Sequence, residues 1–413
     1  MNTRIRRVVV TGLGVISPVG NTMEQCWDSL VRGVHGIGPI TRFDTTAYKA
    51  KLAAEVREFD PAAYMDKSEI RRSDRYAQFG LAAACQAMED SGIAGTLPPE
   101  RMAVYFGSGI GGMETFSQEY DKLRSRGPGR VSPFFVPMMI PNMAAGMIAI
   151  RFDCRNAAMP AVTACASGSN AIGEALRAIR HGYADGAIAG GAEASITEIG
   201  VAGFINMQAL SVAENPDEAS MPFDSRRRGF VIGEGAAALI LEEYEHAKAR
   251  GARIYGEVCG YGSTCDAYHI TAPRPDADGG ARAMLQALEE AGYTGREAVY
   301  INAHGTGTPL NDTAETLAIK KALGEEQARA AWISSTKSMT GHMLGAAGAL
   351  EAAVCLKTLQ TGMIPPTIHL LSPDRACDLN YVPNTAVKAE LDLALSNSLG
   401  FGGHNACLAF RRV

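Results

Sequence analysis

The decapeptide VTACASGSNA, residues 162–171, places Cys165 between a short β-branched run and a series of very small residues. The segment NAIGEALRAIRHG that follows has apolar residues at helical spacing, so a helix should begin just after the cysteine. A thiol at a helix N-terminus faces unpaired N–H groups and the positive end of the dipole, which both favour the thiolate. The alternative is a buried cysteine that acts as a small hydrophobe. The local context favours a nucleophile.

Two histidines and a lysine lie in similar turns of small residues. His304, in NAHGTGTPLND, follows an apolar strand and precedes two glycines and two threonines, a shape that suits close approach by a ligand. In SSTKSMTGHMLGAAGA, Lys337 and His342 are five residues apart, and His342 comes just before a helix of small residues. The helix dipole disfavours an imidazolium there, so we expect a neutral His342 that can donate a hydrogen bond. The turn NSLGFGGHN holds one aromatic residue, Phe401, among glycines.

Other chemistries are poorly supported by the motifs. GSGIGG at 107–112 lacks both the spacing and the following acidic residue of a dinucleotide-binding loop, and the chain has no P-loop. His304, His342 and His404 could form a metal set, but none is paired with a carboxylate at i, i+4, as hydrolytic metal helices require. We therefore expect no metal site.

The chain contains an internal repeat, in which the same sequence of helices and strands occurs twice, and this repeat must position the cysteine, the histidines and the lysine. QAMEDSGI at 86–93 is matched by QALEEAGY at 286–293, and each is followed by a strand-like run, VYFGSGIGG or VYINAHGTG. A small-residue helix and a closing strand come next, the latter in GAIAGGAEAS and in ALSNSLGFGGHNACLAF. This alternation predicts an α/β fold of two pseudo-symmetric halves in one compact unit, divided near residue 250. The glycine-rich turns at 107–112, 303–307 and 400–403 should then meet at one place.

Composition narrows the class of protein. The chain has 413 residues, of which 46% are hydrophobic, and a formal charge of −5, which argues against a nucleic-acid partner. There is no apolar run long enough to cross a bilayer and no secretory signal pattern. The nine cysteines form no C-x-x-C pair, so free thiols and a cytoplasmic location are expected.

The ordered motifs TACASG, HGTGT, STKSMTGHMLGAAG and GFGGHN resemble those of the β-ketoacyl-[acyl-carrier-protein] synthases of the thiolase superfamily. The resemblance covers essentially the whole chain and is closest to the type II elongating class, synthase II. It implies a thiolase-like fold of five layers, αβαβα, with an N-terminal half over 1–250 and a C-terminal half over 251–413. It also implies a homodimer, acyl carrier protein as the partner, and no cofactor beyond the phosphopantetheine that the carrier brings.

The resemblance implies a decarboxylative Claisen condensation in fatty acid elongation. Cys165 would carry the acyl chain, and the backbone N–H groups of Cys165 and Phe401 would form the oxyanion hole. His304 and His342 would stabilise the enolate of the malonyl group, while Lys337, ion-paired with Glu351, would support them. The acyl pocket would include Ile110, Phe204 and Phe401, the substrate would contact Thr306 and Thr308, and the carrier would dock on Lys67, Arg71, Arg72 and Arg130.

Two alternatives remain from the residues. A discrete polyketide-type ketosynthase would have the same active site. A non-catalytic chain-length partner would be expected to lack the nucleophile, whereas Cys165 is present.

Overall fold

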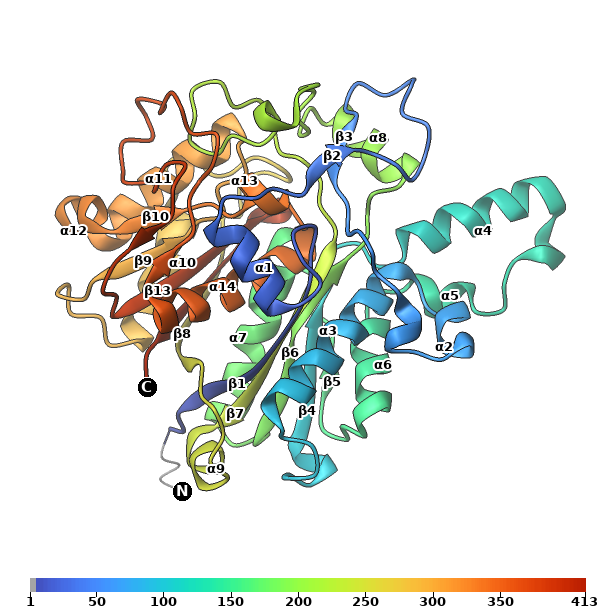
Figure 1. The fold of residues 1–413 in the computed structure, drawn as a ribbon, viewed down its shortest axis with the longest axis horizontal. Helices are drawn as coiled ribbons and strands as arrows, with labels where there is room; N and C mark the ends of the chain where they lie inside the picture. The colour runs from blue at the N-terminus through green and yellow to red at the C-terminus, as the bar shows by residue number, and fades with distance from the viewer. Residues whose placement is uncertain (1–4) are drawn as a thin grey trace.

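The computed structural model describes residues 5–413, in which one large sheet carries the helices on its faces (Figure 1). The ten strands of this sheet run in the order β10-β9-β13-β14-β8-β1-β7-β6-β4-β5. Their bounds are β1 Val8–Ile16, β4 Met102–Gly107, β5 Ala158–Met159, β6 Gly186–Glu193, β7 Gly235–Glu243, β8 Gly256–Cys265, β9 Val299–Asn302, β10 Trp332–Ser334, β13 Leu393–Gly400 and β14 His404–Arg411. Two short ribbons pair β2 Ile37–Pro39 with β3 Leu52–Ala54 and β11 Met363–Ile364 with β12 Val387–Lys388.

Fourteen α-helices lie in the described residues. They are α1 Met23–Val31, α2 Lys67–Arg71, α3 Arg75–Ser91, α4 Met113–Arg126, α5 Phe135–Met139, α6 Met143–Phe152, α7 Ser167–Arg180, α8 Glu198–Asn206, α9 Tyr244–Ala249, α10 Asp278–Glu290, α11 Pro309–Leu323, α12 Glu325–Ala330, α13 Lys337–Thr340 and α14 Ala347–Thr361. Within residues 5–413, none of them is long and apolar enough to cross a membrane.

The sheet is built from two copies of one strand pattern. In the first half β4 runs parallel to β6, and β7 is antiparallel to both β6 and β1. In the second half β9 runs parallel to β13, and β14 is antiparallel to both β13 and β8. The halves join where β1 meets β8, through only two residue pairs, Val9 with Glu257 and Val10 with Gly256. The predicted internal repeat is therefore present in the fold.

The two halves of the sheet form two β layers, and helices lie between them and on their outer faces, which gives five layers in all. The central layer consists of α7 and α14, which pack on each other and on the strands of the two halves, while α3 covers β1 and β7 and α10 covers β8 and β14. Small residues permit the close central packing: a Cβ on Gly168 would lie 2.9 Å from the Ala349 nitrogen, and one on Gly348 would lie 2.1 Å from Ser169 Oγ. The expected αβαβα arrangement is confirmed.

Each central helix is preceded by the same kind of turn. A 3-10 turn, Ala164–Ala166, leads into α7, and another, Leu344–Ala346, leads into α14. Both turns begin at a non-glycine residue in the left-handed region, with φ of 50° at Ala164 and 47° at Leu344. Such strain persists only where the surrounding structure enforces it.

One prediction was wrong in the second half. The segment ALSNSLGFGGHNACLAF forms a hairpin of two strands, β13 and β14, with the turn Phe401–Gly403 between them, and not a single closing strand. The reason is the glycine pair Gly402 and Gly403, which both have φ near 80° and so reverse the chain. The boundary near residue 250 stays a prediction, and it falls directly after α9.

Candidate active site

Cys165 lies in the strained turn before α7, as a nucleophile at a helix N-terminus would. Its side chain is buried, with 7% of the residue exposed. The turn is fixed by Ser167, whose hydroxyl donates to the Ala164 carbonyl at 2.7 Å and accepts from the Thr163 N–H at 2.9 Å. The thiol is therefore held in one place by the backbone around it.

The two predicted histidines lie beside this thiol. His342 Nε2 is 3.0 Å from Cys165 Sγ, and the rings of His304 and His342 meet edge to face with centroids 5.2 Å apart. Phe230 also packs edge to face with His342, at a centroid distance of 5.1 Å. The structure thus brings Cys165, His304 and His342 together, although they lie in different parts of the chain.

Backbone hydrogen bonds orient both histidine segments. The Glu315 carboxylate accepts from the N–H groups of His304 and Gly305, both at 2.7 Å, so it clamps the turn after β9. His342 donates its N–H to the Val231 carbonyl at 2.7 Å, and its own carbonyl accepts from Gly233 at 2.8 Å. Each imidazole is therefore carried by a fixed main chain.

Lys337 and Glu351 form the expected ion pair, and both side chains are almost fully buried. Burial, and then the charge of Lys337, keep the pKa of both His304 and His342 well below the usual range of histidine. Both rings are thus neutral at physiological pH. For His342 we expected this state from the helix dipole, but burial is the larger cause.

The expectation of a resting thiolate is not met. Burial raises the pKa of the Cys165 thiol to about 12, although the Lys337 charge and the N–H groups of Phe401 and Cys165 lower it. Desolvation of the buried sulfur outweighs the helix end, because a charged group loses its hydration there. At neutral pH the pair at rest is therefore a thiol and a neutral imidazole.

The turn after β13 packs closely on Cys165. A Cβ on Gly400 would lie 2.8 Å from the Thr163 carbonyl and 3.2 Å from the Cys165 nitrogen, so only glycine permits this approach. The next residue, Phe401, lines the same cavity as Cys165, and the N–H groups of Phe401 and Cys165 both lower the pKa of the thiol. Both groups are therefore close enough to the sulfur to act on a charge that develops beside it.

A cavity of about 700 Å³ opens onto Cys165, His304 and His342. Its lining is largely apolar and includes the predicted Phe204 and Phe401 as well as the predicted Thr306 and Thr308, whose hydroxyls lie 3.0 Å apart. Ile110 does not line this cavity. It packs in the same apolar cluster as Cys165 and Phe204.

Two buried carboxylates at the site were missed from the sequence. Glu315 holds the His304 turn, as described above. Glu193, at the end of β6, is fully buried and accepts from Gly109, Ile110 and Gly345, which ties the turn after β4 to the turn before α14. In the sequence, the only indication of a role for Glu193 is its place at the end of a strand that otherwise holds small and apolar residues.

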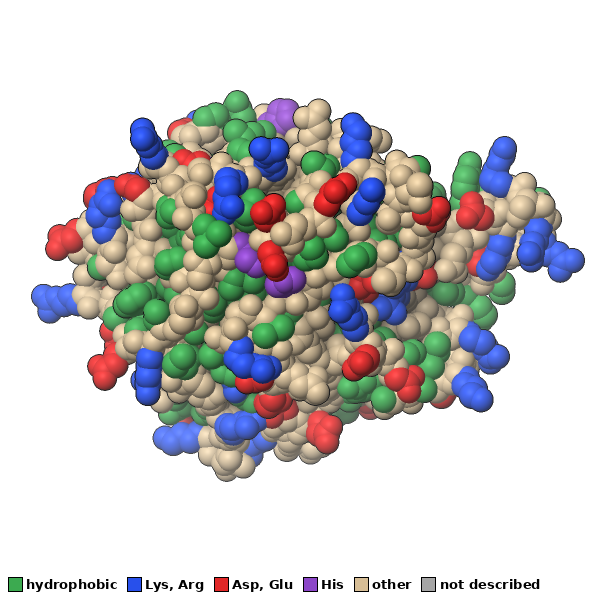
Figure 2. All heavy atoms as spheres, turned by 45° about the horizontal axis from the view of Figure 1, so that its top comes forward, with side chains coloured by type: hydrophobic (Ala, Val, Ile, Leu, Met, Phe, Trp, Pro, Cys, Tyr) green, Lys and Arg blue, Asp and Glu red, His purple; other side chains and the backbone are tan. Residues whose placement is uncertain are grey.

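The four residues predicted to dock a carrier lie away from the cavity lining. Lys67 and Arg71 belong to α2, Arg72 follows it and stacks over Phe134, and Arg130 comes after α4; all four are exposed. In Figure 1, α4 projects from the body of the molecule, and Figure 2 shows Lys and Arg side chains gathered at that projecting end. The four residues are exposed to solvent, and their role stays a prediction.

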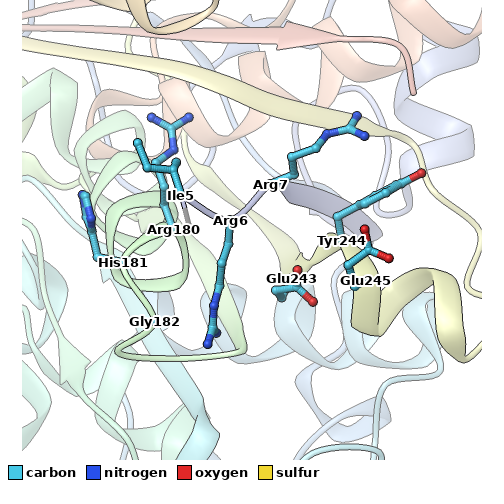
Figure 3. A pocket seen from close by; sticks show the side chains of 9 residues that line it. All are labelled: Ile5, Arg6, Arg7, Arg180, His181, Gly182, Glu243, Tyr244 and Glu245. Carbon is cyan, nitrogen blue, oxygen red and sulfur yellow. The ribbon is translucent and has the colours of Figure 1, made fainter. Parts of the chain in front are cut away.

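A second cavity, of about 420 Å³, lies at the start of β1 and lacks catalytic geometry (Figure 3). The side chains of Arg6, Arg7 and Arg180 point away from one another in that view. Each is already paired with a carboxylate, Asp185, Glu257 and Glu290 respectively.

The chain matches family models over most of its length. Residues 5–247 match the N-terminal domain of the β-ketoacyl synthases, and residues 255–371 match the C-terminal domain. The chain therefore belongs to the β-ketoacyl synthase family.

Individual relatives cover the whole chain. A 3-oxoacyl-[acyl-carrier-protein] synthase 2 of Synechocystis is 49% identical over 413 residues, which are 100% of this chain and 99% of the relative. The protein of the same name from Staphylococcus aureus is 48% identical over 98% of both chains. Among solved structures, a type II PKS ketosynthase, bound to the hexaketide and in complex with its acyl-carrier protein, is similar with a TM-score of 0.90 and 34% identity over 99% of both chains.

Proposed function

We propose that the protein is a β-ketoacyl-acyl-carrier-protein synthase that lengthens an acyl chain by two carbons in fatty acid synthesis. The observation that carries the proposal is the contact between Cys165 and His342, with His304 beside them, on a largely apolar cavity. The 48–49% identity to proteins named 3-oxoacyl-[acyl-carrier-protein] synthase 2 supports the same conclusion.

In the first half-reaction an acyl chain passes from the carrier to the enzyme. Cys165 Sγ attacks the thioester carbonyl and its proton passes to the sulfur of the departing carrier thiol, while His342 Nε2, 3.0 Å from Sγ, donates its N–H toward the reacting sulfur. The N–H groups of Cys165 and Phe401 stabilise the tetrahedral oxyanion. The carrier thiol leaves with the proton, and an acyl thioester remains on Cys165.

In the second half-reaction malonyl carrier protein enters. Its carboxylate leaves as CO2, and the electron pair of the broken bond forms an enolate whose oxygen accepts hydrogen bonds from His304 and His342. The neutral state of both rings suits this role, because each then has an N–H to donate and no charge to balance. The carbanion attacks the acyl carbonyl, Cys165 leaves as a thiolate that takes a proton from water, and β-ketoacyl carrier protein is released.

Lys337 acts as a support in this scheme, since its ammonium is paired with Glu351. Its charge disfavours protonation of both histidines and so preserves them as neutral donors. The phosphopantetheine arm of the carrier delivers both substrates as thioesters, and no further cofactor takes part. The exposed Lys67, Arg71, Arg72 and Arg130 would receive the acidic carrier.

A polyketide-type ketosynthase is the second candidate, supported by the TM-score of 0.90 to a type II PKS ketosynthase. The higher identity to the named 3-oxoacyl synthases favours the fatty acid assignment. The presence of Cys165 argues against a non-catalytic chain-length partner.

We further propose that the protein works as a homodimer in the cytoplasm. Strand β5 ends the sheet with both of its residues exposed, and Met159 and Val162 are about half exposed, so an unpaired apolar edge is available to a second copy. All nine cysteines are free thiols, which fits a reducing compartment.

The test uses purified protein, acyl carrier protein loaded with an acyl chain, and malonyl carrier protein. One round of extension with stoichiometric CO2 is expected, and mass spectrometry of the acylated enzyme should place the acyl group on Cys165. Cys165→Ala should form neither adduct nor product. Repeated extension without reduction would favour the polyketide candidate, and an adduct on Cys154 or Cys407 would overturn the assignment of the nucleophile.

A further inference from the structure

A group of metal-ligating side chains lies at the surface, apart from the active site. His35 precedes β2, Asp217 lies in the 3-10 turn Pro216–Glu218, and His369 lies between α14 and β12. One atom of each residue, an imidazole nitrogen or a carboxylate oxygen, lies within 4.8 Å of the other two. On the face shown in Figure 2, histidine side chains lie beside acidic ones.

The spacing of these atoms approaches that of a tetrahedral metal site. A zinc ion bound at 2.0–2.1 Å would set its ligand atoms about 3.3 Å apart. Asp217 Oδ1 is 3.0 Å from His35 Nε2 and 3.7 Å from His369 Nε2. Two of the three separations are thus near the tetrahedral value, and Asp217 has room to adjust because its side chain is 68% exposed.

One hydrogen bond at the cluster must change for an ion to bind. In His35, Nδ1 accepts from the Ile37 N–H at 3.2 Å, which places the ring proton on Nε2. Binding through Nε2 returns that proton to water while Nδ1 takes one up, and it costs the hydrogen bond from Ile37.

All three segments are anchored to the same helix, α13, which begins at Lys337 and leads to His342. Gly36, next to His35, donates its N–H to the Met339 carbonyl at 2.9 Å. Ile368, next to His369, donates its N–H to Ser338 Oγ at 3.1 Å. Ser220, three residues after Asp217, donates its hydroxyl to the Lys337 carbonyl at 2.9 Å.

We propose that His35, Asp217 and His369 bind one divalent transition-metal ion of the zinc class, and that the bound ion clamps the three segments that hold α13. Two imidazoles and one carboxylate, with water as the fourth ligand, form a ligand set that zinc accepts. The ion would take no part in the condensation, and the inference does not depend on the proposed function.

The binding test uses Zn²⁺ and Co²⁺ alone as probes. Cys165→Ala serves as the background, because Cys165 and its two histidines could themselves bind a soft metal. Equilibrium dialysis should give one metal per chain, with the visible absorption of tetrahedral Co²⁺. His369→Asn and the exposed Asp217→Ala, each added to the background, should weaken binding by at least about tenfold.

The matched control is His181→Asn, which removes an exposed histidine far from the cluster in sequence and should leave binding unchanged. Asp217→Ala keeps the test decisive if His369→Asn fails to fold. Absence of binding in the background, or equal binding in both ligand variants, would overturn the site.

Hydrogen exchange tests the clamp. Zn²⁺ should slow amide exchange across 337–343 in the background, and this protection should disappear in Asp217→Ala. Binding without added protection would show that the ion is held at the surface and does not act on α13.

Discussion

At the scale of single residues, the side chains near Cys165 divide into those that touch its sulfur and those that act through charge. His342 belongs to the first group, at 3.0 Å, and Lys337 to the second. His304 faces the same cavity without a bond to the sulfur. The two histidines should therefore differ in what their loss does to each half-reaction.

In the proposed mechanism, replacement of either histidine by alanine removes a preorganised donor to the enolate. We expect decarboxylation to fall by roughly 10²–10³ in both His304→Ala and His342→Ala. Acyl transfer to Cys165 should survive at least in part, and more fully in His304→Ala, because that ring does not contact the thiol. Release of labelled CO2 and single-turnover acylation, measured in parallel, check this division. Lost acylation with continued CO2 release would contradict it.

The sequence alone identified Cys165, His304, His342 and Lys337, because each stands in a turn of small residues beside a strand or helix. It could not show how far burial and neighbouring charges shift the pKa of each of these groups. The helix end near Cys165 is visible in the pattern of residues, but the burial that raises the pKa of its thiol to about 12 arises from segments far away in the chain. Glu193 and Glu315 were missed for the same reason.

At the scale of elements, Glu193 joins two turns that carry different parts of the site. It accepts N–H groups from the turn after β4 and from the turn before α14. Burial raises the pKa of its carboxyl from 4.5 to about 6. The folded protein therefore binds this proton more tightly than the unfolded chain, and stability from this group falls as the pH rises from 4.5 to about 6.

Glu193→Gln should remove this dependence. The free energy of unfolding of the parent, relative to the variant, should decrease by up to about 2 kcal/mol between pH 4.5 and 6. Denaturant unfolding at a series of pH values measures it, and Glu100→Gln, at an exposed position, is the control. An equal pH slope in parent and Glu193→Gln would show that Glu193 does not titrate in this range.

The turn after β4 also carries Ile110, whose side chain packs against the cluster that contains Cys165 and Phe204. Ile110→Phe should overfill this region, at a typical cost of about 1–3 kcal/mol, and press the wall into the cavity. Long acyl donors should be rejected while short ones are still extended. Extension rates over a ladder of acyl chain lengths test this, and an equal loss for every donor would show that Ile110 is structural.

At the scale of the whole molecule, the predicted repeat was visible because the same order of helix, strand and turn occurs twice in the sequence. The hairpin of β13 and β14 was not recognised, since its turn, Phe401–Gly403, interrupts what looks like one apolar run. The narrow junction between β1 and β8 could not be foreseen either, because strand pairing between the halves leaves no local pattern.

The exposed edge at β5 predicts how the molecule assembles. Met159→Lys places a charge on this edge, which should prevent a second sheet from pairing with it. The wild-type protein should have the mass of a dimer by light scattering, and the variant the mass of a monomer. A dimer that persists in the variant would place the contact between copies elsewhere.

The 3-10 turns that precede α7 and α14 occupy equivalent places in the two halves. Gly345 occupies, before α14, the position that Cys165 occupies before α7, and a Cβ there would lie 2.3 Å from the Gly109 nitrogen and 2.8 Å from Glu193. No side chain, and hence no second nucleophile, fits in that turn. We therefore expect saturating acyl donor to load one equivalent of acyl group per chain, at Cys165, and we expect the extender unit to react while still tethered to its carrier.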